Sequence, residues 1–250
     1  MRYIVSRNFT LLWFGRIISQ MGDKFYAIAL ALWVLGYTNS PGAMGIYLTA
    51  TMLPGIVLGL FIGPFIDRLN KRNILIVTDI IRGCIIGGGL ILSLTGILAF
   101  WHIILAAILL SLCSSFFETS IQAIIPEVVE KEQLPKANSL NQLVGGICNI
   151  LGPAVGAAAV VFFGYNWIFV INALSFMISA LFELFVQYKR QDHAKHTTSI
   201  LADAREGFQY LLGQKRILII ITIIGIAHFF MGSMTVALPF LAGTLNGRCT

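Results

Sequence analysis

Long apolar runs recur along the whole chain, and they limit the folds open to this sequence more than any other feature. Each run exceeds the roughly 18 residues that mark a bilayer span. Because backbone polar groups in lipid must be paired within the span, each run is predicted to form a helix. The seven runs cover residues 9–35, 43–65, 74–98, 101–125, 140–163, 167–186 and 217–241.

The balance of residue types excludes a water-soluble fold. Hydrophobic residues make up 57% of the 250 positions and charged residues only 11%, whereas a soluble domain contains about 25% charged residues. A net charge of +6 would suit a nucleic-acid partner only if the basic residues shared one face, and they instead fall in alternate loops. The sequence therefore predicts an all-α membrane protein with the lipid bilayer as its solvent and no nucleic-acid partner.

The distribution of Lys and Arg predicts the orientation of the helices. These residues precede the first run and follow the second, fourth and sixth runs, while the loops 36–42, 99–100 and 164–166 contain none. Positive residues are retained on the cytoplasmic side of a membrane. We therefore expect a multi-pass protein of the cell membrane with a cytoplasmic N-terminus.

Three segments follow from this pattern. Residues 1–186 are predicted to be an N-terminal six-helix transmembrane bundle, and residues 187–216 a cytoplasmic central loop with an amphipathic helix. Residues 217–250 are predicted to be a seventh transmembrane helix with a short tail. A seventh span after a complete six-helix group would have no partner helices, so we expect it to be the first helix of a second half that is missing from the sequence.

No pattern typical of an enzyme, a cofactor or a metal site is found. The four cysteines have no CxxC spacing and no histidine at ligand distance in the sequence. The sequence contains no phosphate-binding loop, no HExxH pair and no hydrolase nucleophile motif. We expect no catalytic residue, no cofactor and no metal, and energy from ATP would require another chain.

The loop after the second run places one acid among three cations, in the segment GPFIDRLNKR at 63–72. This segment resembles motif A of the major facilitator superfamily, G-x-x-x-D-R-x-G-R-R. Asn70 stands where the motif has a glycine, and this departure is mild because asparagine tolerates the left-handed backbone that glycine would supply. The resemblance implies a gate in which the aspartate faces the N-terminus of a helix in another half of the protein. The alternative is a positive loop with an incidental acid. The matching residues are Gly63, Asp67, Arg68, Lys71 and Arg72.

A glycine-rich stretch in the fifth run resembles motif C, which is typical of antiporters in the same superfamily. Gly152, Pro153 and Gly156 match it, whereas Ala157 stands where a second glycine is common. Small residues let helices approach closely, and a proline favours a bend. The resemblance implies export, and the alternative is a general helix-packing face.

Ionisable residues within the spans are the candidates for proton coupling, since each costs at least a few kcal/mol unless it is paired or faces water. Arg16, Gln20 and Asp23 are spaced i, i+4 and i+7 and share one helix face. Partial desolvation of Asp23 would favour its protonated form, as a reversible proton carrier requires. The alternative is a structural ion pair of Asp23 with Arg16 or Lys24.

A second polar group is expected between the third and fourth runs. Asp79, Arg82 and Glu118 lie at similar predicted depth and are expected to form a buried gating network with a cation of the 63–72 segment. Glu118 is also the second candidate for proton coupling. Glu183, near the end of the sixth run, is expected to extend to the membrane surface.

Taken together, the resemblance covers residues 3–241 and includes the segments 19–23, 79–82 and 125–127. It is to the branch of macrolide-efflux and enterobactin-exporter-like proteins within the major facilitator superfamily. It implies a secondary transporter that exports a hydrophobic or amphiphilic small molecule, of the drug, macrolide or siderophore class, in exchange for protons by alternating access. Such an antiporter would confer multidrug resistance, and would need the missing C-terminal half or a second subunit. Two alternatives stay open: the membrane subunit of an ATP-driven complex, or an inactive truncated fragment.

Overall fold

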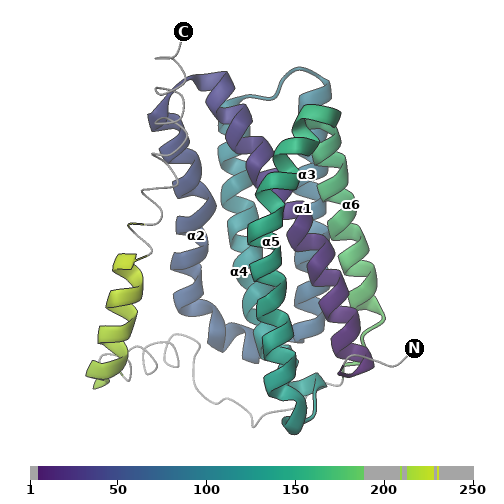
Figure 1. Ribbon diagram of the computed structural model, residues 1–250, viewed down its shortest axis with the longest axis vertical. Coiled ribbons are helices and arrows are strands. Elements are labelled where there is room, and N and C mark those ends of the chain that lie inside the picture. Colours follow the sequence, from purple (N-terminus) through teal and green to yellow (C-terminus); the bar gives the residue numbers. More distant parts are fainter. Residues whose placement is uncertain (1–4, 189–208, 210–212, 228–229, 231–250) are drawn as a thin grey trace.

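The computed structural model describes residues 5–188, 209, 213–227 and 230, and within them it contains helices and no strand. Six long helices pack side by side (Figure 1). The all-α prediction is therefore confirmed. The helices are α1 (Arg7–Thr38), α2 (Pro41–Asp67), α3 (Lys71–Leu94), α4 (Phe100–Val128), α5 (Leu134–Phe163) and α6 (Tyr165–Leu184), with a short 3-10 turn, η1 (Lys131–Gln133), before α5.

Helix length and composition agree with a membrane-spanning bundle. Five of the described helices, α2 to α6, contain stretches long and apolar enough to cross a bilayer. The sixth, α1, is longer still at 32 residues but contains three ionisable residues in its middle part, Arg16, Asp23 and Lys24. Residues 215–227 form a further helical segment. Most of the predicted connector 187–216 and the end of the seventh run lie outside the described residues.

Side-chain caps explain where three of the helices begin. Ser6 accepts a hydrogen bond from the backbone N–H of Phe9 at the start of α1, and Ser40 caps α2 in the same way. Asn70 caps α3 and has an extended backbone with a φ of −76°. The expectation that Asn70 uses a left-handed conformation is therefore wrong, because its side chain is needed as a hydrogen-bond acceptor at this helix start.

The packing of the helices against one another gives α1 a central position in the bundle. It packs against α5 and α6, while α3 packs against α4 and α6, and α2 packs against α4. Figure 1 shows α1 crossing the bundle obliquely between these neighbours. Its polar residues are therefore held inside the helix bundle rather than facing lipid.

Small residues permit the closest of these contacts. A Cβ atom added at Gly22 of α1 would collide with the side chains of Ser175 and Asn172 of α6. Gly55 of α2 approaches α4 in the same way, and its backbone N–H donates a hydrogen bond of 3.0 Å to the Ser111 hydroxyl. Such small-residue contacts are a usual basis for helix association in membranes.

Candidate functional site

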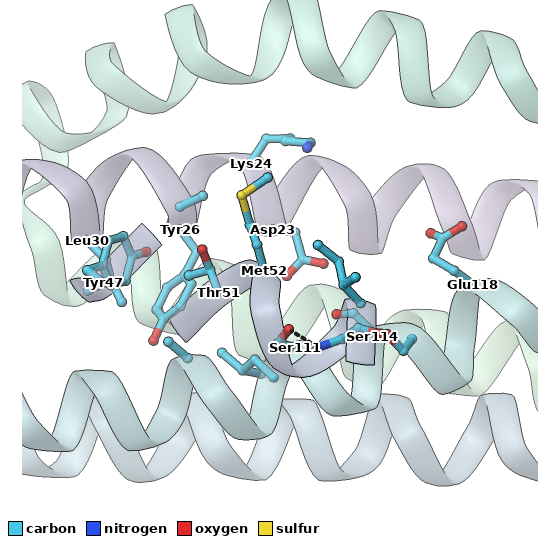
Figure 2. Close-up of a pocket in the computed structure, with 16 residues that line it drawn as sticks. Asp23, Lys24, Tyr26, Leu30, Tyr47, Thr51, Met52, Ser111, Ser114 and Glu118 are labelled. Carbon is cyan, nitrogen blue, oxygen red and sulfur yellow. Dashed lines mark hydrogen bonds between the residues drawn. The ribbon is translucent and has the colours of Figure 1, made fainter. Parts of the chain in front are cut away.

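A cavity of about 490 Å³ opens between α1, α2 and α4. Most of its lining is apolar or hydroxyl-bearing, and the ionisable side chains at its wall include Asp23 and Lys24 from α1 and Glu118 from α4. Figure 2 shows the Asp23 carboxylate and Lys24 leaving α1 in different directions, with Glu118 further along α4. The remaining lining residues include Tyr26, Leu30, Tyr47, Thr51, Met52, Ser111, Ser114 and Ser115.

Glu118 is held by the polar face of α1. Its Oε2 atom lies 2.7 Å from Nη2 of Arg16, and its Oε1 atom accepts a hydrogen bond of 2.9 Å from Gln20. Arg16 is buried and also donates to the Oδ1 atom of Asn141 on α5. The predicted stripe on α1 thus converges on one carboxylate. Asn141 was not predicted, because a single asparagine near a helix start carries no distinctive pattern.

Asp23 is paired with a different arginine. Its Oδ2 atom lies 3.6 Å from Nη1 of Arg82, whose Nη2 atom lies 2.5 Å from Oδ1 of Asp79. The guanidinium of Arg82 also lies 4.3 Å from the centre of the Phe117 ring and 4.5 Å from that of Phe176. Two carboxylates and two aromatic rings therefore fix this buried cation.

These pairs argue against one alternative from the sequence and correct one expectation. Asp23 forms no ion pair with Arg16 or Lys24 among the described residues, because Arg16 is turned toward Glu118 and Arg82 reaches Asp23 from α3. The expected single network was wrong in its membership: Asp79 and Arg82 are in contact as predicted, but Glu118 belongs to a separate pair. The two carboxylates at the cavity wall are consequently held by two different arginines.

The cations of the 63–72 segment bind elsewhere. The Lys71 ammonium lies 3.0 Å from Oε1 of Glu127 at the end of α4, and the Tyr188 hydroxyl donates to Oε2 of the same carboxylate. Arg72 donates through Nε to the backbone carbonyl of Glu183, at 3.0 Å. These contacts tie the start of α3 to the ends of α4 and α6, so neither cation joins Asp79.

Two other matching residues of this segment, Asp67 and Gly63, have few neighbours among the described helices. Asp67 is exposed and Arg68 is half-buried. A Cβ atom added at Gly63 would meet no described atom within 4 Å. The bundle described here therefore supplies no reason for a glycine at this position, and the role of the segment as a latch stays a proposal.

Gly152 and Gly156 of α5 pack directly on α1. A Cβ atom added at Gly156 would lie 2.9 Å from Cα of Phe25, and one added at Gly152 would collide with the side chain of Lys24. Pro153 lies between them inside α5. These contacts are those of a helix-packing face, and a further role in antiport stays untested.

The expectation for Glu183 was wrong. Only 1% of this residue is exposed, so its side chain does not reach the membrane surface. The reason is that the face of α6 bearing Ser175, Ser179 and Glu183 lies inside the bundle. Their spacing of four residues within an apolar run is a signal that could have predicted this burial.

The fold and its charged cavity define a multi-pass membrane protein whose helix bundle can hold a small solute. The family model described as Major Facilitator Superfamily matches residues 12–247, and the chain belongs to this superfamily. The resemblance drawn from the motifs is therefore confirmed. This family consists of transporters rather than enzymes.

Several curated proteins are similar to the chain at low identity. An uncharacterized MFS-type transporter, YfiS, of Bacillus subtilis is 26% identical over 79% of this chain and 47% of its own length. Macrolide efflux protein A of Streptococcus pyogenes is 24% identical over 90% of this chain and 56% of its own. Multidrug efflux pump Tap of Mycobacterium bovis is 23% identical over 80% of this chain and 50% of its own length. The chain thus spans about half the length of the curated relatives it matches.

Proposed function

We propose that the protein containing this chain is a secondary active transporter that exports a hydrophobic or amphiphilic small molecule in exchange for protons. The observation that carries the proposal is the cavity between α1, α2 and α4, whose wall combines apolar and hydroxyl side chains with the carboxylates of Asp23 and Glu118. Its volume of about 490 Å³ lies in the usual range for small-molecule sites. A compound of the drug, macrolide or siderophore class fits such a lining.

The names of the relatives favour export as the direction of transport. Two of them are called efflux proteins, one for macrolides and one for multiple drugs. Export of a dissolved solute by this family implies alternating access, in which two helix bundles rock about a site near the middle of the membrane. Residues 1–186 supply one such bundle in this proposal, residues 217–250 begin a second, and transport requires that second half or another subunit.

Asp23 is the preferred proton carrier of the two cavity carboxylates. Both side chains have access to water, since 33% of the Asp23 side chain and 38% of the Glu118 side chain are exposed. The ion pair of Asp23 with Arg82 spans 3.6 Å, whereas Glu118 is held by Arg16 at 2.7 Å and by Gln20. Because the looser pair is more easily broken by protonation, Asp23 exchanges protons and Glu118 mainly anchors α1 to α4.

The remaining parts of the proposal concern topology and gating. The N-terminus and the connector 187–216 are cytoplasmic, and the protein lies in the cell membrane. Asp67 then stands at the cytoplasmic boundary, where its exposed carboxylate latches one conformation against a helix N-terminus outside the described bundle. Lys71 and Arg72 fix the start of α3 so that this boundary moves as one piece with the bundle.

Transport driven by an imposed pH gradient tests this function. The full-length gene product is reconstituted into liposomes with a lipophilic fluorescent dye as the probe, and no ATP is present. We expect dye accumulation that requires the pH gradient and stops on addition of a protonophore. Accumulation that needs ATP and ignores the protonophore would contradict proton coupling and favour an ATP-driven complex.

A further inference from the structure

A buried polar stripe runs along α6, which does not line the cavity. It is formed by Asn172, Ser175, Ser179 and Glu183, all of which are at most 5% exposed. Their spacing places them on one face of the helix. From the first to the last, the stripe extends roughly 16 Å along the helix axis. An apolar transmembrane helix therefore carries a path of closely spaced polar side chains inside the bundle.

The stripe faces the two carboxylates that share Arg82. Asn172 lies against α1 at Gly22 and close enough to Asp23 to interact with its carboxylate. Ser179 lies beside Asp79, although its hydroxyl forms no hydrogen bond of normal geometry.

At the far end of the stripe, Glu183 interacts electrostatically with both Asp79 and Arg82. The path thus begins at a cavity carboxylate, Asp23, and ends in the last turn of α6. It passes one buried cation, Arg82, which is 3% exposed.

Several buried atoms along this path lack hydrogen-bond partners among the described residues. They include two carboxylate oxygens, Oδ2 of Asp79 and Oε2 of Glu183, and three donor groups, Nδ2 of Asn172, the Ser179 hydroxyl and Nε of Arg82. Asp79 and Glu183 are 0% and 1% exposed, so water does not reach them from the surface. Unpaired buried acceptors cost about 1–3 kcal/mol each, and more when charged. A proton bound to one carboxyl group would supply the missing donor.

Charge balance points to the same conclusion. Asp23, Asp79 and Glu183 lie around a single guanidinium, that of Arg82. Asp23 is partly solvated from the cavity, whereas Asp79 and Glu183 are buried and are left with at least one excess negative charge in a region of low dielectric constant. The neighbouring groups do not cancel it. Arg16 is bound to Glu118, Lys71 to Glu127 and Arg72 to backbone carbonyls of α6, Lys24 packs on Gly152 of α5, and Cys113 on α4 is a free thiol.

We infer that Asp79 and Glu183 form a buried proton-binding site that holds one proton and is coupled through Arg82 to Asp23 in the cavity. The inference rests on the proposed proton-coupled transport and names the buried group that gives up its proton when Asp23 binds one. When a proton from the cavity binds Asp23, the ion pair with Arg82 breaks. The guanidinium then pairs wholly with the Asp79 and Glu183 carboxylates, which no longer need their proton.

Glu183 then loses this proton at the end of α6, on the side that is cytoplasmic in the proposed topology, in a state of the transport cycle that admits water there. One proton binds at Asp23 and one leaves at Glu183, so the charge of the cluster is the same before and after. No proton passes through Arg82, which remains a cation throughout. When Asp23 later releases its own proton to the cytoplasmic side, Arg82 returns to it and the inner pair takes up a proton from that side, so each cycle carries one proton across the membrane, the one bound by Asp23.

Infrared difference spectroscopy of the full-length gene product tests the site without any transport. A protonated buried carboxyl group gives a carbonyl band that persists at neutral pH and shifts on deuteration. We expect this band in the wild type, and its loss in Glu183→Gln or Asp79→Asn. The matched control Glu132→Gln, which changes an exposed acid in η1, should keep it. No band in the wild type, or a band unchanged in both inner variants, would overturn the inference.

Proton release on addition of substrate separates this inference from the proposed function. If the wild type releases protons, Glu183→Gln should slow release roughly tenfold, equivalent to about 1.4 kcal/mol in the barrier, while Glu132→Gln leaves it unchanged. Unchanged release in Glu183→Gln would exclude the inner site from the route. If the wild type releases no protons, the proposed coupling fails, and the infrared band still decides whether the buried site exists.

Discussion

Replacing Arg82 by methionine should destabilise the protein in a pH-dependent way. Methionine keeps an apolar side chain between Phe117 and Phe176 but removes the only cation within ion-pair distance of Asp79 among the described residues. The buried carboxylate must then take up a proton. At pH 7 this costs about 4 kcal/mol for an aspartate with an ordinary pKa near 3.9. Loss of the contacts to the two rings adds about 1 kcal/mol each.

The destabilisation expected for Arg82→Met is therefore about 4–6 kcal/mol at pH 7, within the range seen when one partner of a buried pair is removed. At about 2–4 °C per kcal/mol, thermal unfolding in detergent should begin at least about 8 °C lower. At pH 5 the penalty should shrink by about 2–3 kcal/mol, because protonation is then easier. The additional change Asp79→Asn should restore most of the loss, since it removes the unpaired charge.

The control variant is Arg82→Lys, which keeps the charge but has one nitrogen in place of the two that contact Asp23 and Asp79, and loses the planar stacking on the rings. It should be less destabilised than Arg82→Met, with a penalty that changes little between pH 7 and pH 5. An Arg82→Met protein as stable as the wild type would refute the reasoning. So would a penalty that does not change between pH 7 and pH 5, or a double variant less stable than Arg82→Met alone.

Three further variants test packing, topology and gating. Gly156→Leu should lower the melting temperature by several degrees, because overpacking costs about 1–3 kcal/mol and a Cβ atom there lies 2.9 Å from the backbone of α1. Gly145→Leu should leave the melting temperature unchanged, because an added Cβ there meets no described atom within 4 Å. Equal losses in the two variants would contradict the packing argument. In a cysteine-free background, single cysteines at Asn39 and Glu132 should react with an impermeant reagent from opposite sides of the membrane, and labelling of both in intact cells would overturn the topology. Asp67→Asn should abolish transport without reducing membrane insertion, and normal efflux would remove its gating role.

The fold was predictable from the sequence because backbone polar groups in lipid must be hydrogen-bonded within the span. Each apolar run had to be a helix, and the run at 9–35 became α1, Arg7–Thr38, with only its ends shifted. The positions of the loops followed from Gly, Pro and charged residues. The ends shifted because caps such as Ser6 depend on individual side chains that hydropathy does not register.

The site was predictable only in its residue types. The sequence showed that Arg16, Gln20 and Asp23 share one face of α1, but it could not show which arginine pairs with which acid. That choice depends on the rotation of α3 and α4 about their axes, which brings Arg82 to Asp23 and leaves Glu118 to Arg16. Burial of Glu183 was missed because an acid near the end of a span usually extends to water.

Substrate-induced proton release in proteoliposomes tests the central claim, that Asp23 is the cavity group that couples proton movement to export. The full-length gene product is compared with Asp23→Asn and Glu118→Gln in weakly buffered medium, with a lipophilic dye as substrate and a pH indicator as the readout. The account predicts that Asp23→Asn abolishes proton release while downhill dye movement continues, since the helix bundle remains intact. Unchanged release from Asp23→Asn, with loss of release in Glu118→Gln, would contradict the account and assign the coupling to Glu118.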